Sequence, residues 1–261
     1  HTHDRILPDF HYDAPMRIFF RKLHRWLGLL MAIQIVAWMA SGLYFSLFPI
    51  SEIRGEHLTR EAELLDPGQL DDLPSPAMVE RLLDQHFPAG WTLTGLDASM
   101  SDGRALWRVQ GSSAGGPFTR LIDASGNGVV PPLSESDAAA KARSWLLEGG
   151  SVASVEWLTE ATPGSEYRGA LLPVWRVSFD QPHSLTLYIE PWSGELLARR
   201  TNRWRVFDFF WMLHIMDFDT RDDFNHPLLQ ISALLGLVIA LSGVIFWALT
   251  TPLFRRRRVS A

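Results

Sequence analysis

The stretch that decides the fold is Trp26–Phe48, WLGLLMAIQIVAWMASGLYFSLF, in which Gln34 is the one strongly polar side chain. A second stretch of this kind, Leu228–Thr250 (LLQISALLGLVIALSGVIFWALT), lies near the other end of the 261-residue chain. Each has 23 residues. As a helix, each is about 34 Å long, enough to cross a hydrocarbon core of about 30 Å. We therefore expect two transmembrane helices. The alternative is a pair of buried core helices, which do not need apolar runs this long.

Basic residues flank both stretches on the same side of the expected membrane. Four of them precede the first stretch and four follow the second: Arg17, Arg21, Lys22 and Arg25, and then Arg255 to Arg258. Because basic flanks concentrate on the cytoplasmic side, we expect both termini in the cytoplasm. The residues between the helices then lie in the periplasm of a bacterium, with the helices in its inner membrane. The first helix is expected to be a retained anchor, because its apolar run is longer than that of a cleaved signal peptide.

The chain between the two apolar stretches is polar and acidic. From Ser51 to Arg203 it has 21 acidic and 13 basic residues, a net charge of −8. This charge argues against nucleic acid as a partner. The chain has no cysteine, which excludes disulfides, covalent c-type haem, iron–sulfur clusters and thiol catalysis. It also has no P-loop, dinucleotide fingerprint or nucleophile elbow, so hydrolytic or nucleotide chemistry is not indicated and enzymatic activity is left open.

The segment between the apolar stretches consists of two similar halves. A helix followed by antiparallel strands is expected in each: Pro76–Phe87, Ala105–Gln110 and Phe118–Asp123 in the first, and Ser134–Glu148, Val152–Leu158, Val174–Phe179 and Ser184–Glu190 in the second. Trp107 matches Trp175, and Asp123 matches Glu190, at offsets of 68 and 67 residues. A nearly fixed offset indicates a duplication. Each half is therefore predicted to be a helix packed on a small antiparallel sheet, with Trp107 and Trp175 in the core.

A short aromatic segment, Trp204–Phe218, precedes the second apolar stretch. As a helix it spans only about 22 Å, too little to cross a bilayer. We expect it to lie in the outer interface, with Arg205 and Asp208 facing the headgroups; the alternative is a core helix of the outer domain. The expected organisation is a cytoplasmic tail (1–16), transmembrane helix 1 (17–50), two periplasmic repeats (51–133 and 134–203), an interfacial aromatic segment (204–226), transmembrane helix 2 (227–251) and a basic cytoplasmic tail (252–261).

Three local sequences resemble the PepSY-associated transmembrane family, and a fourth resembles part of a PepSY domain. Arg21–Gly28 (RKLHRWLG) resembles its start, and Ile53–His57 (IRGEH) and Asp223–Pro227 (DFNHP) resemble segments beside its helices. Leu185–Leu196 resembles the end of a PepSY domain. The resemblance covers most of the chain from Arg17 to Leu249, and it implies that the two repeats are PepSY-like. Some relatives are inner-membrane reductases of siderophore-bound iron that hold b-type haems with histidine pairs, and PepSY domains alone have been proposed to regulate proteases.

Four histidines are the candidate ligands of a cofactor. His57, His214 and His226 all fall near the outer membrane face, whereas His24 lies at the inner end of the first helix. Imidazole is the commonest neutral ligand of haem iron and also suits copper, zinc and iron. We expect His214 and His226 to hold a b-type haem or a metal, with His57 as the third choice. His24 is too far from them along the helix and would need a partner from another chain.

The surroundings of these histidines allow a second interpretation. An apolar slot for haem would be lined by Phe207, Phe210, Trp211, Leu213 and Phe224. Alternatively, the four imidazoles have structural roles. His226 would then cap the second helix, His57 would pair with Glu56 or Glu52, and His24 would contact phosphate headgroups.

Small residues recur along both apolar stretches and predict close helix packing. Ser232, Gly236 and Ala240 are spaced four apart, with Gly243 close to the same face, and Ala37, Ser41 and Gly42 lie in the first stretch. Partners are expected to be the lipid bilayer and either a second copy or another protein, bound through the helices. The functional hypothesis is a membrane electron-transfer component, similar to an iron reductase. The alternatives are an accessory subunit without catalysis and a PepSY-type protease regulator.

Overall fold

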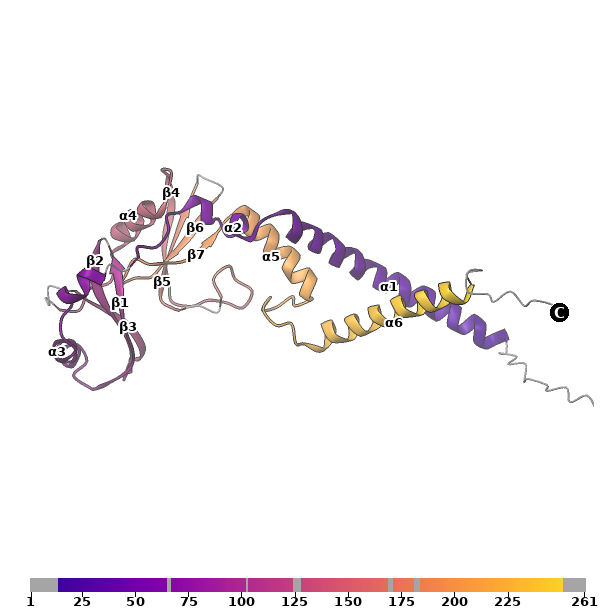
Figure 1. Cartoon of the computed structure of the whole chain (residues 1–261), viewed down its shortest axis with the longest axis horizontal. Coiled ribbons are helices and arrows are strands. Elements are labelled where there is room, and N and C mark those ends of the chain that lie inside the picture. The colour runs from indigo at the N-terminus through magenta and orange to yellow at the C-terminus, as the bar shows by residue number, and fades with distance from the viewer. Residues whose placement is uncertain are drawn as a thin grey trace, which may run out of the picture. The chain divides into compact units, whose positions relative to one another are not determined.

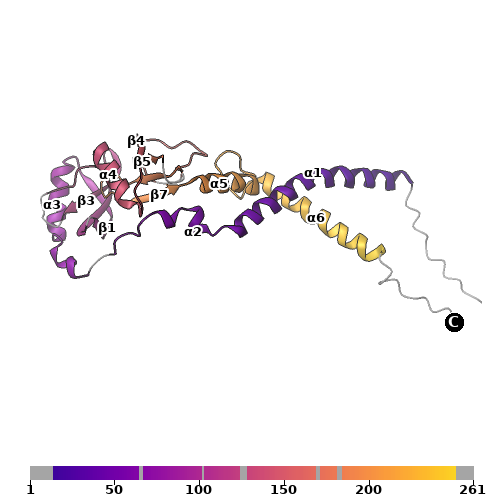
Figure 2. The same ribbon diagram turned by 90° about the horizontal axis from the view of Figure 1, so that it is seen from above.

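The computed structural model describes residues 14–250, except 65–66, 102, 124–127, 169–170 and 181–183. The chain divides into two compact units. One consists of His1–Leu47 and Asp208–Ala261 and is called here the apolar-helix unit; the other is Phe48–Phe207 and is called the sheet unit. Figures 1 and 2 show the labelled elements of both from two directions.

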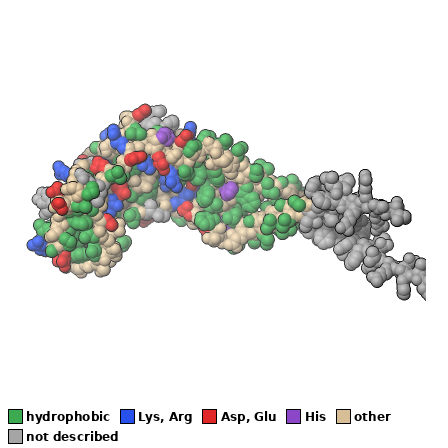
Figure 3. Space-filling model, viewed as in Figure 1, with side chains coloured by type: hydrophobic (Ala, Val, Ile, Leu, Met, Phe, Trp, Pro, Cys, Tyr) green, Lys and Arg blue, Asp and Glu red, His purple; other side chains and the backbone are tan. Residues whose placement is uncertain are grey.

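The apolar-helix unit contains α1 (Ala14–Leu47), α6 (Pro227–Thr250) and the second part of α5 (Asn202–Ile215). The two expected helices are thus present. By length and composition, Arg25–Leu47 and Pro227–Val244 could each cross a membrane. Their large side chains are mostly exposed: Ile33 and Met39 keep 70% of their surface and Leu234 keeps 61%. Core helices of a water-soluble protein would bury such side chains, so that alternative does not describe this unit. Figure 3 shows the apolar side chains gathered over this unit.

Close packing of α1 on α6 involves only some of the small residues. A Cβ added at Gly236 would lie 3.5 Å from Met31 Cε and 3.7 Å from Trp38 Cζ3, so α1 lies directly against this glycine. Ser232 is buried. By contrast, a Cβ at Gly42 or Gly243 would meet nothing within 4 Å among the described residues. The predicted approach of the helices is therefore local to Gly236.

The first half of the sheet unit is a helix and a three-stranded antiparallel sheet. Helix α3 (Pro76–His86) is followed by β1 (Trp91–Ser101), β2 (Arg104–Ser113) and β3 (Gly116–Asp123), in the order β1-β2-β3. Val79 and Leu83 of α3 pack on Val109 and Ile122 of the sheet, with Trp107 at the edge of this core. Three short helices precede it: α2 (Ile50–Ile53), η1 (Glu56–Leu58) and η2 (Pro67–Asp72).

The second half repeats this arrangement with one more strand. Helix α4 (Glu135–Trp145) precedes β4 (Val152–Leu158), β5 (Val174–Phe179), β6 (Thr186–Ile189) and β7 (Leu196–Arg200), which form an antiparallel sheet in that order. Ser134 caps α4, because its hydroxyl accepts a hydrogen bond from the Asp137 amide. Ala142 packs on Val177 and Leu187.

The two matched tryptophans occupy equivalent places. Trp107 pairs with Ile122 and Trp175 with Ile189 on the neighbouring strand. Each indole N–H donates to a backbone carbonyl, Trp107 to Pro74 at 2.8 Å and Trp175 to Leu133 at 3.1 Å. Each of these carbonyls belongs to the residue just before the serine at the N-cap position of the helix, Ser75 for α3 and Ser134 for α4. The indoles therefore tie the start of each helix to its sheet.

Candidate functional site

Helix α5 ends inside the apolar-helix unit, and its end is the centre of the candidate site. The aromatic segment was expected to be helical as far as Phe218, but α5 stops at Ile215. Met216 follows with φ of 57°, the left-handed conformation that commonly terminates a helix. The last carbonyl groups of a helix have no partner within it, so they need donors from elsewhere.

Side chains from both apolar helices supply those donors. Gln34 Nε2 donates to Leu213 O at 3.3 Å, and Trp38 Nε1 donates to His214 O at 2.7 Å. His226 Nε2 lies 2.8 Å from Ile215 O. Three successive carbonyls at the end of α5 are thus satisfied by α1 and by the residue that precedes α6. These hydrogen bonds matter most in an apolar environment, because an unpaired carbonyl there costs several kcal/mol of folding free energy.

Three side chains on one face of α1 point to this helix end. Gln34, Trp38 and Ser41 follow one another at intervals of four and three residues, which places them in one row. Gln34 stands out in the sequence for its polarity and Ser41 for its small size, whereas no pattern in the sequence indicated Trp38. The signal that could have found the site is this row of hydrogen-bonding groups on an otherwise apolar helix.

The ring of His214 is held by the third member of the row. Ser41 Oγ lies 2.7 Å from His214 Nδ1 and 2.7 Å from Ala37 O. A carbonyl can only accept, so we assign the serine hydrogen to Ala37 O and the ring hydrogen to Nδ1. Nε2 of His214 then carries a lone pair, and it makes no hydrogen bond within the described residues. Burial lowers the pKa of His214, which favours the neutral ring.

Aromatic rings of α1 and α5 pack beside this histidine. The ring centroids of Phe45 and His214 are 5.6 Å apart, those of Tyr44 and Phe210 5.2 Å, and those of Phe45 and Trp211 6.2 Å. Of the residues expected to line a slot, Phe210 and Trp211 therefore belong to this cluster. Phe224 is 57% exposed, and Phe207 falls in the sheet unit.

His226 has the capping role that was the alternative to ligation. Its Nδ1 accepts the Leu229 amide at 3.5 Å, inside the first turn of α6, while its Nε2 donates to Ile215 O. Both ring nitrogens are therefore engaged with backbone groups. Ligation of one iron by His214 and His226 together stays a prediction, and it would require His226 to give up one of these two contacts.

The other two candidate histidines, His57 and His24, make no described contact with this cluster. His57 belongs to the sheet unit, where it is exposed and makes no hydrogen bond or ion pair within the described residues. Its expected partners are engaged otherwise: Glu56 approaches Arg54 to 4.0 Å, and Glu52 pairs with Arg203. The backbone of His24 is part of α1, but its ring lies outside the described residues.

The two charged residues expected to face headgroups are instead paired within the protein. Arg205 binds both carboxylate oxygens of Glu166, with Nε–Oε1 at 2.6 Å and Nη2–Oε2 at 3.1 Å. Asp208 is only 4% exposed and binds Arg221 Nη1 at 2.5 Å. A carboxylate buried to this extent requires a partner cation. This expectation is therefore corrected.

The loop after α5 is organised around Asp217. Its carboxylate accepts the backbone amides of Asp219, Thr220, Asp222 and Asp223 at 3.1 Å each, together with the Thr220 hydroxyl at 2.5 Å. Burial alone would raise the pKa of Asp217, but the hydroxyl and the amides outweigh it and hold this pKa well below its usual range. The loop between α5 and α6 is thus pinned by a carboxylate that stays ionised.

Known proteins do not identify the chemistry of this site, so its contacts are the evidence for it. No family model, no curated protein and no solved structure matches the chain. Within the described residues, no group of three or more His, Asp or Glu side chains could hold a metal ion. The feature with the clearest chemical capacity is therefore a single neutral imidazole, His214, oriented by Ser41.

Proposed function

We propose that the protein is an integral membrane protein of the bacterial inner membrane, related to the PepSY-associated transmembrane family. Helices α1 and α6 would cross the bilayer, both termini would be cytoplasmic, and the sheet unit would be periplasmic. The exposure of Ile33, Met39 and Leu234 supports this, because lipid is the solvent that suits such a surface. The basic flanks of both helices support the orientation.

We further propose that the sheet unit is a duplication of a PepSY-like element. The support is the pair of equivalent indole hydrogen bonds from Trp107 and Trp175, each to the carbonyl before the serine at a helix N-cap position. Two halves of unrelated origin would not be expected to share this hydrogen bond.

For activity, we propose a haem-binding electron-transfer component with His214 as an axial ligand. One observation carries this proposal: Ser41 Oγ lies 2.7 Å from both His214 Nδ1 and Ala37 O, and we therefore assign the ring hydrogen to Nδ1 and a lone pair to Nε2. Protein ligands to metals commonly have this arrangement, in which one ring nitrogen donates to a neighbour and the other binds the metal. A bound b-type haem would supply one-electron chemistry, in keeping with iron reduction by a redox partner. Both ring nitrogens of His226 face backbone groups in this arrangement, so a second protein ligand would come from elsewhere in the chain or from a second copy.

An absorption spectrum tests this proposal. The full chain, expressed with added haem precursor and purified in detergent, should show a Soret band that shifts on reduction with dithionite. His214→Ala should abolish the band, and His226→Ala should keep it while lowering the melting temperature. Parallel His24→Ala and His57→Ala variants report whether either ring is the second ligand. A folded wild-type protein that binds no haem on reconstitution would remove the electron-transfer function.

The second candidate is a non-catalytic accessory subunit or a PepSY-type protease regulator. The observation in its favour is that His226 uses both ring nitrogens to tie α5 to α6, which is a structural task. In that case the well-packed end of α5 would serve only to build the membrane anchor. Cross-linking of the full chain in membranes should then trap a defined partner protein, and the purified protein should be colourless.

A further inference from the structure

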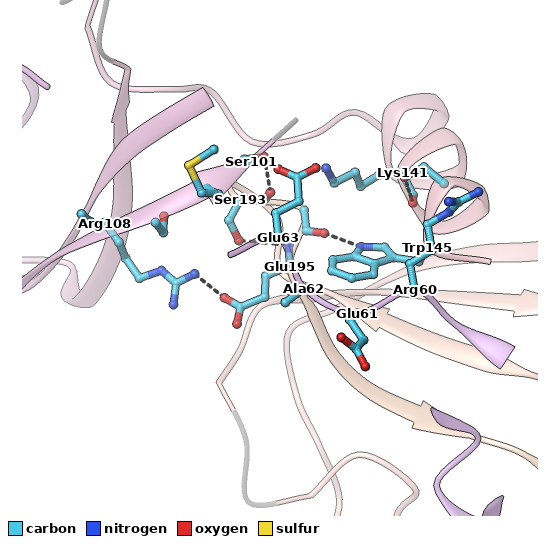
Figure 4. A pocket seen from close by; sticks show the side chains of 15 residues that line it. Arg60, Glu61, Ala62, Glu63, Ser101, Arg108, Lys141, Trp145, Ser193 and Glu195 are labelled. Atoms are coloured by element: carbon cyan, nitrogen blue, oxygen red, sulfur yellow. Dashed lines mark hydrogen bonds and ion pairs between the residues drawn. The ribbon is translucent and has the colours of Figure 1, made fainter. Parts of the chain in front are cut away.

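The turn between β6 and β7 meets two arginines from the first half of the sheet unit. Figure 4 shows the first of them, Arg108 of β2, which forms an ion pair with Glu195 of the turn. The second is Arg120 of β3, whose guanidinium carbon lies 4.4 Å from the ring centroid of Trp192. Both arginines therefore contact the same turn, one through a carboxylate and the other through an aromatic ring.

The charges of these two arginines are balanced differently. Arg108 has the Glu195 carboxylate beside it, whereas Arg120 makes no ion pair with any described residue. The Glu190 carboxylate attracts Arg120, but its Oε2 already accepts two backbone amides and a hydroxyl of its own turn. Burial lowers the pKa of Arg120, and Glu190 offsets this only in part. A half-buried cation in this state favours an additional anion beside it.

Aromatic rings hold the guanidinium of Arg120 in place. Besides Trp192, the ring centroids of Phe87 and Phe118 lie 5.6 and 5.9 Å from its central carbon. Such contacts stabilise a cation through the faces of the rings. They use none of its N–H groups, which lie in the guanidinium plane and stay available for hydrogen bonds.

The hydrogen bonds of Arg120 use only part of its capacity. Its Nε donates to His86 Nε2 at 3.4 Å, and its Nη1 donates to Thr119 O at 2.8 Å. Its Nη2 donates to no described residue. A carboxylate suits the remaining N–H groups, because it can accept two parallel hydrogen bonds from one guanidinium.

Arg120 and Trp192 line a cleft of about 360 Å³. It is formed by parts of β1, β2 and β3, by residues 171–173 before β5 and by the turn after β6. Arg120 is the one cation and Glu190 the one anion among its described lining residues. Leu171 and Leu172 present apolar surface to it, since they are 62% and 37% exposed. The other apolar residues that line it are Pro117, Phe118 and Pro173. Apolar walls with a few polar groups that orient the ligand are typical of small-molecule sites.

We propose that this cleft binds a small organic carboxylate with an apolar body. The carboxylate accepts hydrogen bonds from Arg120, and the apolar body packs against Trp192, Leu171 and Leu172. The unbalanced charge of Arg120 argues for the anion, and the apolar walls argue for the body. This inference concerns the sheet unit alone and is independent of haem binding at His214.

Three probes test the two parts of the proposal. Cinnamate, its neutral analogue cinnamamide and acetate are titrated by calorimetry against the full chain in nanodiscs, with empty nanodiscs as the blank. Cinnamate should bind at least about tenfold more tightly than either of the others, because it alone has both the charge and the apolar body. Equal affinities of cinnamate and cinnamamide would refute recognition of the carboxylate. Equal affinities of cinnamate and acetate would refute the apolar part, and no binding of cinnamate would overturn the whole proposal.

Arginine variants locate the carboxylate. Arg120→Gln should weaken the binding of cinnamate at least about tenfold, toward that of cinnamamide. Arg104→Gln is the matched control and should have no effect, because Arg104 is exposed on β2 and lies outside the lining. Arg120→Lys keeps the charge without the planar fork, so its affinity should fall between those of the wild type and Arg120→Gln. Melting temperatures of all variants report whether each one folds.

Leucine variants locate the apolar body. Leu171→Ala shortens one wall of the cleft and should weaken the binding of cinnamate about two- to fivefold. Leu147→Ala should not, because Leu147 is 54% exposed and lies outside the lining. If Arg120→Gln bound cinnamate as tightly as Arg104→Gln, or Leu171→Ala as tightly as Leu147→Ala, this cleft would not be the binding site.

Discussion

Ser41 Oγ on α1 and His214 Nδ1 on α5 lie 2.7 Å apart and join two helices that are separated by most of the chain. Ser41 is completely buried, and its hydroxyl also reaches the carbonyls of Ala37 and Trp38. The hydroxyl therefore fixes both the orientation of the imidazole and the nitrogen that carries its hydrogen. This relationship makes His214 different from the other described histidines.

Replacement of Ser41 by alanine should disturb the imidazole without a large change in volume. In Ser41→Ala the Nδ1 hydrogen loses its acceptor, and the ring is free to change tautomer. If His214 is a haem ligand, loss of such an orienting partner should reduce haem affinity about 10- to 100-fold. Haem titration followed at the Soret band measures this effect.

Ser46→Ala is the matched control for that experiment. Ser46 lies on the same helix but is exposed, and its hydroxyl donates only to Leu43 O in its own helix. Its haem affinity should equal that of the wild type. If Ser41→Ala also left the affinity unchanged, the orienting role of Ser41 would be refuted.

The donors that cap α5 should matter for stability rather than for cofactor binding. Trp38→Phe keeps the ring but removes the N–H that reaches His214 O. Gln34→Leu similarly removes the donor to Leu213 O. Each leaves a poorly solvated carbonyl without a partner, at a cost of about 1–3 kcal/mol in unfolding free energy. Thermal unfolding in detergent should show both losses. Trp26→Phe, at a 63% exposed ring, should show none.

The helices and most strands could be predicted because local patterns determine them. The apolar runs predicted α1 and α6. The alternation of apolar and polar residues predicted β4 and β5 with the boundaries that the structure has. Strand β7 was missed because its sequence does not alternate between apolar and polar residues and ends in two arginines. In the fold, all five of its residues are half-buried. The first half also contains β1, which was not assigned as a strand although it is long.

The site was harder to predict because it depends on which donor meets which acceptor. The sequence predicted His214 and His226 near the same membrane face as ligands of one haem or metal, but the contacts of the two rings differ. His226 lies where the Leu229 amide in the first turn of α6 and the Ile215 carbonyl at the end of α5 both need a partner. His214 meets Ser41 only because α5 ends beside α1. Such pairings are set by tertiary contacts and leave no periodic signal in the sequence.

The equivalence of Trp107 and Trp175 predicts equal responses to the same change. Trp107→Phe and Trp175→Phe each remove one indole donor to the carbonyl before a helix cap. Each should reduce the unfolding free energy by about 1 kcal/mol, the net value of a typical hydrogen bond. Chemical denaturation measures both. Trp157→Phe is the control, because its ring is 41% exposed; a loss there as large as at the two equivalent sites would show that the effect comes from the ring rather than from the N–H.

Asp217 should make the loop between α5 and α6 sensitive to acid. Because its pKa is depressed in the folded state, the ionised carboxylate stabilises the fold above the usual carboxyl pKa of about 3.9, and this contribution is lost as the pH falls below that value. Asp217→Asn removes the charge and one of the accepting oxygens, so it should lower the melting temperature clearly at pH 7 and progressively less below about pH 4. Asp219→Asn changes an exposed neighbour whose amide, not its carboxylate, joins the network, and it should leave the profile unchanged. A difference between wild type and Asp217→Asn that stayed constant from pH 7 to pH 3 would mean that the carboxylate acts through shape alone and that its ionisation contributes nothing to stability.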